Sequence, residues 1–299
     1  MMAADGYYTY TGREAVPRHI TRVRIDESLT VIPANAFRGH RRNKEVDCHD
    51  RVKTVEEYAF ANCPSLRRVI MRGVEEVKKC AFNRCRALTY VECDKLERIR
   101  YGAFDGCESL GSINLPSARI VELYAFNYCK ALMKVKFGKE LEIIGYRAFD
   151  GCTSLERITI PLKDGMITEN NTFQGCKKLK HVDLVEGVGV RDTIAALLLE
   201  QWKNDMDRKI DSINQILSNT PAGNDFDAGG KARALRRWIR SVLRKIICYK
   251  AEHQRLLNEA ASTLQLALPQ DIMVNNVLPF LELPSQMSEV EGHEEGRRR

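Results

Sequence analysis

Residues Ala103–Leu115 read AFDGCESLGSINL, and the spacing of their apolar residues sets the architecture of this 299-residue chain. Cys107 lies three positions after Phe104, and Leu110 lies six positions after Phe104. The same spacing recurs every 22 to 24 residues through the first half of the chain. The copies begin at Phe37, Phe60, Phe82, Phe104, Phe126, Phe149 and Phe173. The first copy has His40 and Asn43 where the others have cysteine and leucine. A period kept over seven copies indicates a stack of repeated units.

The repeated unit reads L-x-x-I-x-x-x-A-F-x-x-C-x-x-L-x-x-V-x-L and has two apolar sides. One unit cannot bury both sides, so its stability has to come from stacking on its neighbours. The last apolar pair is spaced by two, which predicts a short strand with one face turned inward. The cysteines occur once per unit, without a CxxC pair or companion histidines. We therefore interpret them as small core residues and expect no metal and no cofactor.

These copies of A/T-F-x-x-C-x-x-L-x-x-V/I-x-Φ resemble the BspA-type (Treponema pallidum type) leucine-rich repeat, which occurs in bacterial surface proteins and in unicellular eukaryotes. The resemblance covers about residues 20–187. It implies an α/β repeat solenoid of about seven leucine-rich coils. The family is non-catalytic and binds other macromolecules, so the resemblance also implies a protein–protein interaction scaffold.

Composition and motifs exclude several other classes. With 44% hydrophobic residues and 29% charged residues, the chain is long enough to bury a core and is not disordered over most of its length. We find no secretory signal in Met1–Tyr10 and no apolar run of membrane-spanning length, so we expect an intracellular protein, cytoplasmic or nuclear, with reduced cysteines. We also find no phosphate loop, nucleophile elbow, HExxH motif or catalytic carboxylate pair, and expect no enzymatic activity.

The strand of each unit has solvent-facing positions between its core residues, and these positions are the candidate binding surface. The partner-binding candidates are Arg68, Tyr90, Glu92, Lys134, Lys136, Arg157 and His181. One interpretation is an acidic protein partner that contacts the column containing Arg68, Lys134 and Arg157. The other is a solvated face whose mixed charges keep the sheet soluble.

The repeat stops after Leu184, and helical periodicity begins. Apolar spacing predicts helices over 191–217 and 231–268, joined by the linker 218–230 into a helical hairpin within 188–268. This hairpin either caps the last coil or mediates coiled-coil self-association or partner docking. At the two ends of the chain, we expect an N-terminal cap or flexible segment over 1–19, and a short helix and disordered tail over 269–299.

The second predicted helix has a basic face, formed by Arg233, Arg237, Arg240 and Arg244. Such a face is suited to an anionic partner, either a membrane surface or a nucleic acid. The alternative is a solvated face, or one paired with Asp205, Asp207 and Asp211. A further alternative concerns residues 268–283, because Leu268–Leu281 resembles the first helix of an F-box. That resemblance implies an adaptor in protein turnover.

Overall fold

The computed structural model describes residues 6–12, 14–162, 167–169, 171–185, 200–221 and 230–267. The chain divides into two compact units. The solenoid unit comprises Met1–Pro161, Gly165–Val185 and Ile213–Arg236, and the helical unit comprises Leu162–Asp164, Glu186–Ser212 and Arg237–Arg299. The predicted residues 269–299, including the F-box-like segment beyond 267, lie outside the described residues.

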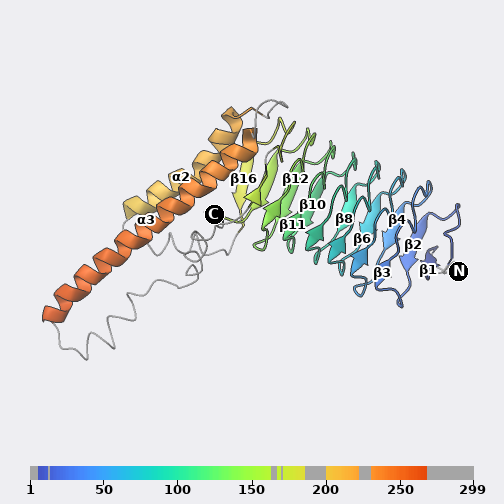
Figure 1. Ribbon diagram of the computed structural model, residues 1–299, viewed down its shortest axis with the longest axis horizontal. Coiled ribbons are helices and arrows are strands. Elements are labelled where there is room, and N and C mark those ends of the chain that lie inside the picture. Colours follow the sequence, from blue (N-terminus) through green and yellow to red (C-terminus); the bar gives the residue numbers. More distant parts are fainter. Residues whose placement is uncertain are drawn as a thin grey trace, which may run out of the picture. The chain divides into compact units, whose positions relative to one another are not determined.

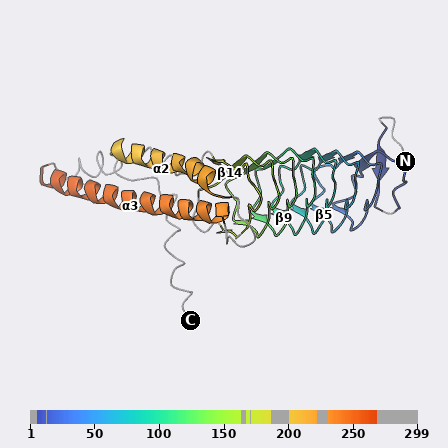
Figure 2. The same ribbon diagram turned by 90° about the horizontal axis from the view of Figure 1, so that it is seen from above.

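The solenoid is built from parallel strands that follow one another coil by coil (Figure 1). The longer strands form two sheets. The first has the order β1(Tyr8–Tyr10), β2(Arg22–Ile25), β4(Glu45–Asp47), β6(Arg68–Ile70) and β8(Tyr90–Glu92). The second has the order β10(Ser112–Leu115), β12(Lys134–Phe137), β14(Arg157–Ile160) and β16(His181–Leu184). Two-residue strands form a third sheet: β3(Val31–Ile32), β5(Thr54–Val55), β7(Glu76–Val77), β9(Arg98–Ile99), β11(Ile120–Val121), β13(Ile143–Ile144) and β15(Ile167–Thr168). Figure 2 shows β5 and β9 along one side of the coils and β14 along the other.

This architecture confirms the predicted repeat solenoid of about seven coils followed by helices. In the described residues 6–185 the second arm of each coil is a two-residue strand followed by turns, and no helix occurs there. Within the predicted segment 1–19, β1 pairs in parallel with β2, and the Tyr10 ring packs edge-on against Phe37 at 4.8 Å between ring centroids.

The repeated phenylalanines form the centre of the core. Their rings are buried and stack in one column, with centroids 5.2 Å apart and planes within 4° for Phe82, Phe104 and Phe126. Strands of the longer sheets such as Lys134–Phe137 alternate buried and exposed residues, because the inner face of the strand covers this column.

Left-handed backbone recurs at the turns, two positions before and two after each phenylalanine. At the second of these positions Gly151 has a φ of 69°, and a side chain there would meet the Tyr128 ring at 2.7 Å. Glycine relieves both the backbone strain and the steric conflict. Tyr128 occupies the equivalent position of its own coil at a φ of 52°, so glycine is not obligatory there.

Two helices follow the solenoid, α2(Glu200–Asn219) and α3(Gly230–Ala267). Within the helical unit, the Trp202 ring stacks on Tyr249 at 5.1 Å, and Trp238 donates a 2.9 Å hydrogen bond to the Lys209 carbonyl. The early residues of α2 therefore face the later residues of α3, which is an antiparallel pairing.

Within the solenoid unit, the end of α2 and the start of α3 contact the last coil. Asn214 accepts a 3.0 Å hydrogen bond from the Val182 backbone N–H of β16. Buried Lys231 donates to the carbonyl oxygens of Leu179 and Leu217. These bonds occupy backbone groups that would otherwise be open at the end of the stack.

Candidate functional site

The strand face is the outward side of the longer strands, and register places its residues in two columns. The first column is Arg22, Glu45, Arg68, Tyr90, Ser112, Lys134, Arg157 and His181. The second is Arg24, Asp47, Ile70, Glu92, Asn114, Lys136, Thr159 and Asp183. All seven predicted partner-binding residues lie in these columns.

The first half of the strand face is neutralised by its own ion pairs. Glu45 lies between two guanidinium groups, 3.6 Å from Arg22 and 3.5 Å from Arg68. Arg68 also lies over the Tyr90 ring, 4.9 Å from its centroid. Glu92 accepts a 2.5 Å hydrogen bond from Arg72, which holds the pKa of the Glu92 carboxyl below its ordinary value. Three of the predicted residues are therefore already engaged with neighbouring side chains.

The second half of the strand face is not fully neutralised by its own ion pairs. Arg157 donates to both carboxylate oxygens of Asp183, at 2.7 and 2.9 Å. Lys134 and Lys136, on β12, are exposed, and neither has a carboxylate within 4.0 Å among the described residues. Register places the uncharged Ser112 and Asn114 beside them.

The predicted column of cations is thus not uniform. Arg68 and Arg157 have carboxylate partners, whereas Lys134 and exposed His181 have none among the residues that the structure describes. Lys136 lies beside Lys134 on the same strand, which makes β12 the centre of unpaired positive charge on this face.

The sheet of two-residue strands is covered by a further set of ion pairs that sequence reasoning missed. Arg100 bridges Glu76 and Glu122, at 2.5 and 2.7 Å. Arg119 pairs with Glu142 at 2.7 Å in the same manner. Each partner lies about one coil away, so these pairs follow the repeat. Partly exposed pairs of this kind contribute little individually to stability, about 0 to 1 kcal/mol.

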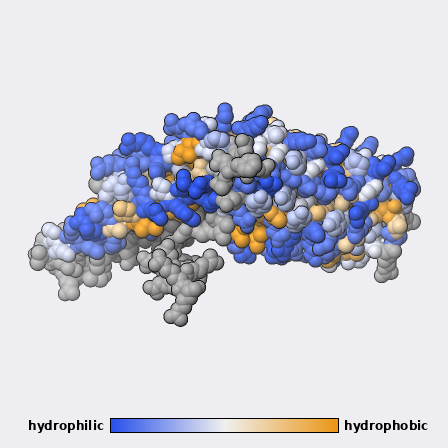
Figure 3. All heavy atoms as spheres, turned by 45° about the horizontal axis from the view of Figure 1, so that its top comes forward, coloured by the Kyte–Doolittle hydropathy of each residue, from blue (hydrophilic) through white to orange (hydrophobic). Residues whose placement is uncertain are grey.

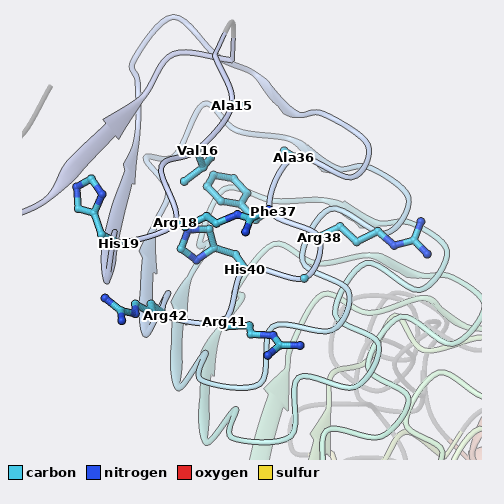
Figure 4. A pocket seen from close by; sticks show the side chains of 11 residues that line it. Ala15, Val16, Arg18, His19, Ala36, Phe37, Arg38, His40, Arg41 and Arg42 are labelled. Atoms are coloured by element: carbon cyan, nitrogen blue, oxygen red, sulfur yellow. The ribbon is translucent and has the colours of Figure 1, made fainter.

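A hollow of about 890 Å³ at the first coil was also missed by sequence reasoning (Figure 4). It lies between two segments of the chain, and its lining residues are Ala15, Val16, Arg18, His19, Ala36, Phe37, Arg38, Gly39, His40, Arg41 and Arg42. The sequence signal that could have indicated it is the departure of the first copy from the repeat at His40.

The basic face of α3 is exposed at Arg233, Arg237, Arg240 and Arg244. None of these four arginines has a carboxylate within 4.0 Å among the described residues. Asp205, one of the acids considered as a partner, instead pairs with Lys245 and accepts a hydrogen bond from Tyr249 at 2.5 Å. Within the described part of the chain, neither helix has the length and apolar character needed to cross a bilayer.

Exposed apolar residues are scattered over the molecule. The face in Figure 3 is mainly hydrophilic, with small separate hydrophobic areas. Met133, directly before β12, is 48% exposed, and Tyr90 on β8 is 45% exposed. Both side chains are of types enriched in protein interfaces.

Comparisons with known proteins identify the repeat. A family model described as BspA type leucine rich repeat region, in six copies, matches residues 17–119 and 97–193. Among solved structures, the chain is similar to the T. pallidum leucine rich repeat protein, with 23% identity over 60% of this chain and 86% of that one and a TM-score of 0.49.

Two further solved structures are similar at lower scores. One is a leucine-rich repeat protein from Bacteroides ovatus, with 22% identity over 54% of this chain and 65% of that one and a TM-score of 0.29. The other is human trophoblast glycoprotein, with 15% identity over 65% of this chain and 83% of that one and a TM-score of 0.35. No curated protein matches the sequence significantly.

Proposed function

Because the chain belongs to the BspA-type leucine-rich repeat family, we propose that it is a non-enzymatic interaction scaffold that binds an acidic protein segment on its strand face. The observation that supports this proposal is the pair of exposed ammonium groups on β12, which have no carboxylate partner among the described residues. Elsewhere on the strand face, arginines are neutralised by carboxylates of the same sheet, as Arg157 is by Asp183. Lys134 and Lys136 are left to pair with carboxylates of another molecule.

The surroundings of β12 favour a protein ligand. Ser112 and Asn114 offer hydrogen bonds on one side, and Thr159 does so on the other. Met133, directly before β12, adds an exposed apolar side chain at the start of this strand. Met is a residue type enriched in protein interfaces.

The test is selection from a displayed random peptide library on the full chain. We expect enrichment of peptides rich in Asp and Glu, and loss of their binding to the double variant Lys134→Glu/Lys136→Glu. The matched control is Lys177→Glu/Lys178→Glu, which makes the same charge change at two exposed lysines of another surface turn. Acidic peptides that bind all three proteins equally would contradict the strand-face proposal.

We propose a capping role for the parts of α2 and α3 that contact the last coil. This is supported by the bonds of Asn214 to Val182 and of Lys231 to Leu179. Self-association through the rest of the helices stays a prediction, to be measured by sedimentation equilibrium of the full chain. The intracellular location also stays a prediction.

A second candidate function is binding of an anionic surface by the basic face of α3, favoured by its four arginines, for which the described residues provide no carboxylate partner. Part of the apolar side of α3 packs against α2, where Trp202 stacks on Tyr249. Binding would therefore be electrostatic and salt-dependent. The triple variant Arg237→Ser/Arg240→Ser/Arg244→Ser is expected to abolish salt-dependent binding to DNA, RNA or acidic vesicles. The third candidate, an adaptor in protein turnover, is tested by deletion of residues 268–283.

A further inference from the structure

The arginines that line the hollow at the first coil differ from most arginines of the solenoid. Most described arginines between residues 14 and 185 have a carboxylate within 4.0 Å, as Arg22 and Arg100 do. Those without one are Arg18, Arg38, Arg41, Arg42, Arg67 and Arg84. Four of these six line the hollow, whose described lining contains no carboxylate. Unneutralised positive charge is therefore concentrated there.

His40 also lines the hollow. Its Nδ1 accepts a 3.1 Å hydrogen bond from the Asn43 backbone N–H. Its Nε2 lies 2.9 Å from the Pro17 carbonyl oxygen, to which it donates, because the ring proton has to be on Nε2 when Nδ1 accepts. Both ring nitrogens are engaged, so the positive charge of the hollow comes from the arginines.

The repeat itself provides an internal comparison. Later coils have cysteine and leucine where the first coil has His40 and Asn43. Asn43 is fully buried, and neither the nitrogen nor the oxygen of its side-chain amide has a hydrogen-bond partner within the described structure. An unsatisfied buried amide lowers stability. The first coil therefore departs from the repeat at a cost in stability, and it is also the coil that forms the hollow. Such a departure indicates that this coil has a function.

We propose that this hollow binds a small molecule that carries several phosphate groups. Guanidinium groups pair with phosphate through two parallel hydrogen bonds, and the volume lies in the range of small-molecule sites. Figure 4 shows the labelled arginine side chains spread around the hollow instead of meeting at one point, which suits several anionic groups better than one. A soluble polyphosphorylated molecule and a phosphoinositide headgroup share this chemistry.

The proposal is tested by calorimetric titration of the full chain with inositol hexakisphosphate and, separately, with inorganic phosphate. We expect binding of the hexakisphosphate to be the tighter of the two. Arg41→Ser/Arg42→Ser is expected to weaken it by about tenfold or more, since each lost charge-assisted contact is worth roughly a factor of ten. The matched control Arg67→Ser/Arg84→Ser removes the same charge from two exposed arginines that also lack a carboxylate within 4.0 Å in the described structure, and is expected to leave the affinity unchanged.

Vesicles separate the two sources of the ligand. Phosphatidylcholine vesicles that contain phosphatidylinositol bisphosphate are compared with phosphatidylserine vesicles of equal charge. Phosphoinositide-selective binding that Arg41→Ser/Arg42→Ser removes supports the proposal and assigns a lipid headgroup, whereas binding of the soluble hexakisphosphate alone supports it and assigns a free ligand. The proposal is overturned if the unmodified chain binds neither probe, if both double variants weaken binding equally, or if inorganic phosphate binds as tightly.

Discussion

The thiol of Cys107 donates a hydrogen bond to the carbonyl oxygen of Phe82, which belongs to the preceding coil and lies 3.2 Å from the sulfur. The same relation joins Cys63 to Phe37 at 3.0 Å. It recurs at every later copy, through Cys85, Cys129, Cys152 and Cys176. The repeated cysteine therefore fills a small buried space and also links adjacent coils through a weak polar contact.

Thiol reactivity is the first expected consequence. Cys248 on α3 is exposed, Cys80 is half-buried, and the other cysteines are buried. Burial raises the pKa of the Cys80 thiol, which slows its alkylation. We expect iodoacetamide at neutral pH to label Cys248 rapidly in the folded protein, as counted by mass spectrometry. Cys248→Ser should remove the rapid phase, and rapid labelling of the core cysteines before unfolding would contradict this account.

The second expected consequence concerns the stability of the protein at alkaline pH. Burial raises the pKa of the Cys93 thiol to about 12, whereas an unfolded thiol ionises near pH 8.5. Between these values the unfolded chain releases protons that the folded chain retains, so the free energy of unfolding falls as pH rises. One such thiol lowers it by about 1.4 kcal/mol per pH unit in this window.

Cys93→Val isolates this effect, because the equivalent strand positions of other coils accept Met71 and Leu115. Urea unfolding at pH 8, 9 and 10 should show a shallower pH dependence for Cys93→Val than for the unmodified protein. Exposed Cys248 offers the control, since Cys248→Ser should leave the slope unchanged. Parallel slopes for all three proteins would refute the prediction.

The phenylalanine column gives a third prediction. Phe104 stacks at 5.2 Å on both Phe82 and Phe126. Phe104→Ala removes two ring contacts and leaves a cavity, so we expect the free energy of unfolding to fall by about 3 to 5 kcal/mol in urea denaturation. Phe173 has a described stacking partner only in Phe149, at 5.8 Å. Phe173→Ala should therefore lower the free energy of unfolding by less than Phe104→Ala does. An equal or greater loss of stability for Phe173→Ala would argue against stacking as the cause.

A stabilising substitution is expected at Asn43. Leucine occupies the equivalent position in the later copies, and the Asn43 amide is buried without a hydrogen bond to described residues. Asn43→Leu removes that unsatisfied group and should raise the free energy of unfolding by about 1 to 3 kcal/mol. Asn43→Ala removes the amide without filling the space, so it should raise the free energy of unfolding by less. A lower melting temperature for Asn43→Leu would show that this coil does not accommodate the core leucine.

Lys231 gives a prediction for the end of the solenoid. Lys231 is 3% exposed, its ammonium group donates only to carbonyl oxygens among the described residues, and burial lowers its pKa below 10.5. The unfolded chain therefore holds this proton to higher pH, and the lysine's contribution to stability increases as pH rises from the lowered pKa towards 10.5. The difference in unfolding free energy between the unmodified protein and Lys231→Met should grow accordingly between pH 7 and 10. A constant difference would contradict it.

Much of the fold followed from residue spacing. The period of the phenylalanines, the inward positions of each strand and the two helices depend on local periodicity, which the chain displays directly. The first strand escaped detection because Tyr8–Tyr10 lies before the first copy of the repeat and forms only by pairing with β2. The thiol-to-carbonyl bonds were equally hidden, since spacing does not reveal which backbone group a buried cysteine reaches.

The sequence by itself determined that the chain forms a stacked repeat with a charged strand face, because apolar spacing is a local property. Only the tertiary structure decided which charges are free, because pairing depends on the residues that register brings together from neighbouring coils. Glu45 lies between Arg22 and Arg68, 23 residues away on either side, whereas Lys134 and Lys136 have no carboxylate within 4.0 Å in the described part of the chain. The hollow likewise exists only where the segment 15–19 folds beside 36–42.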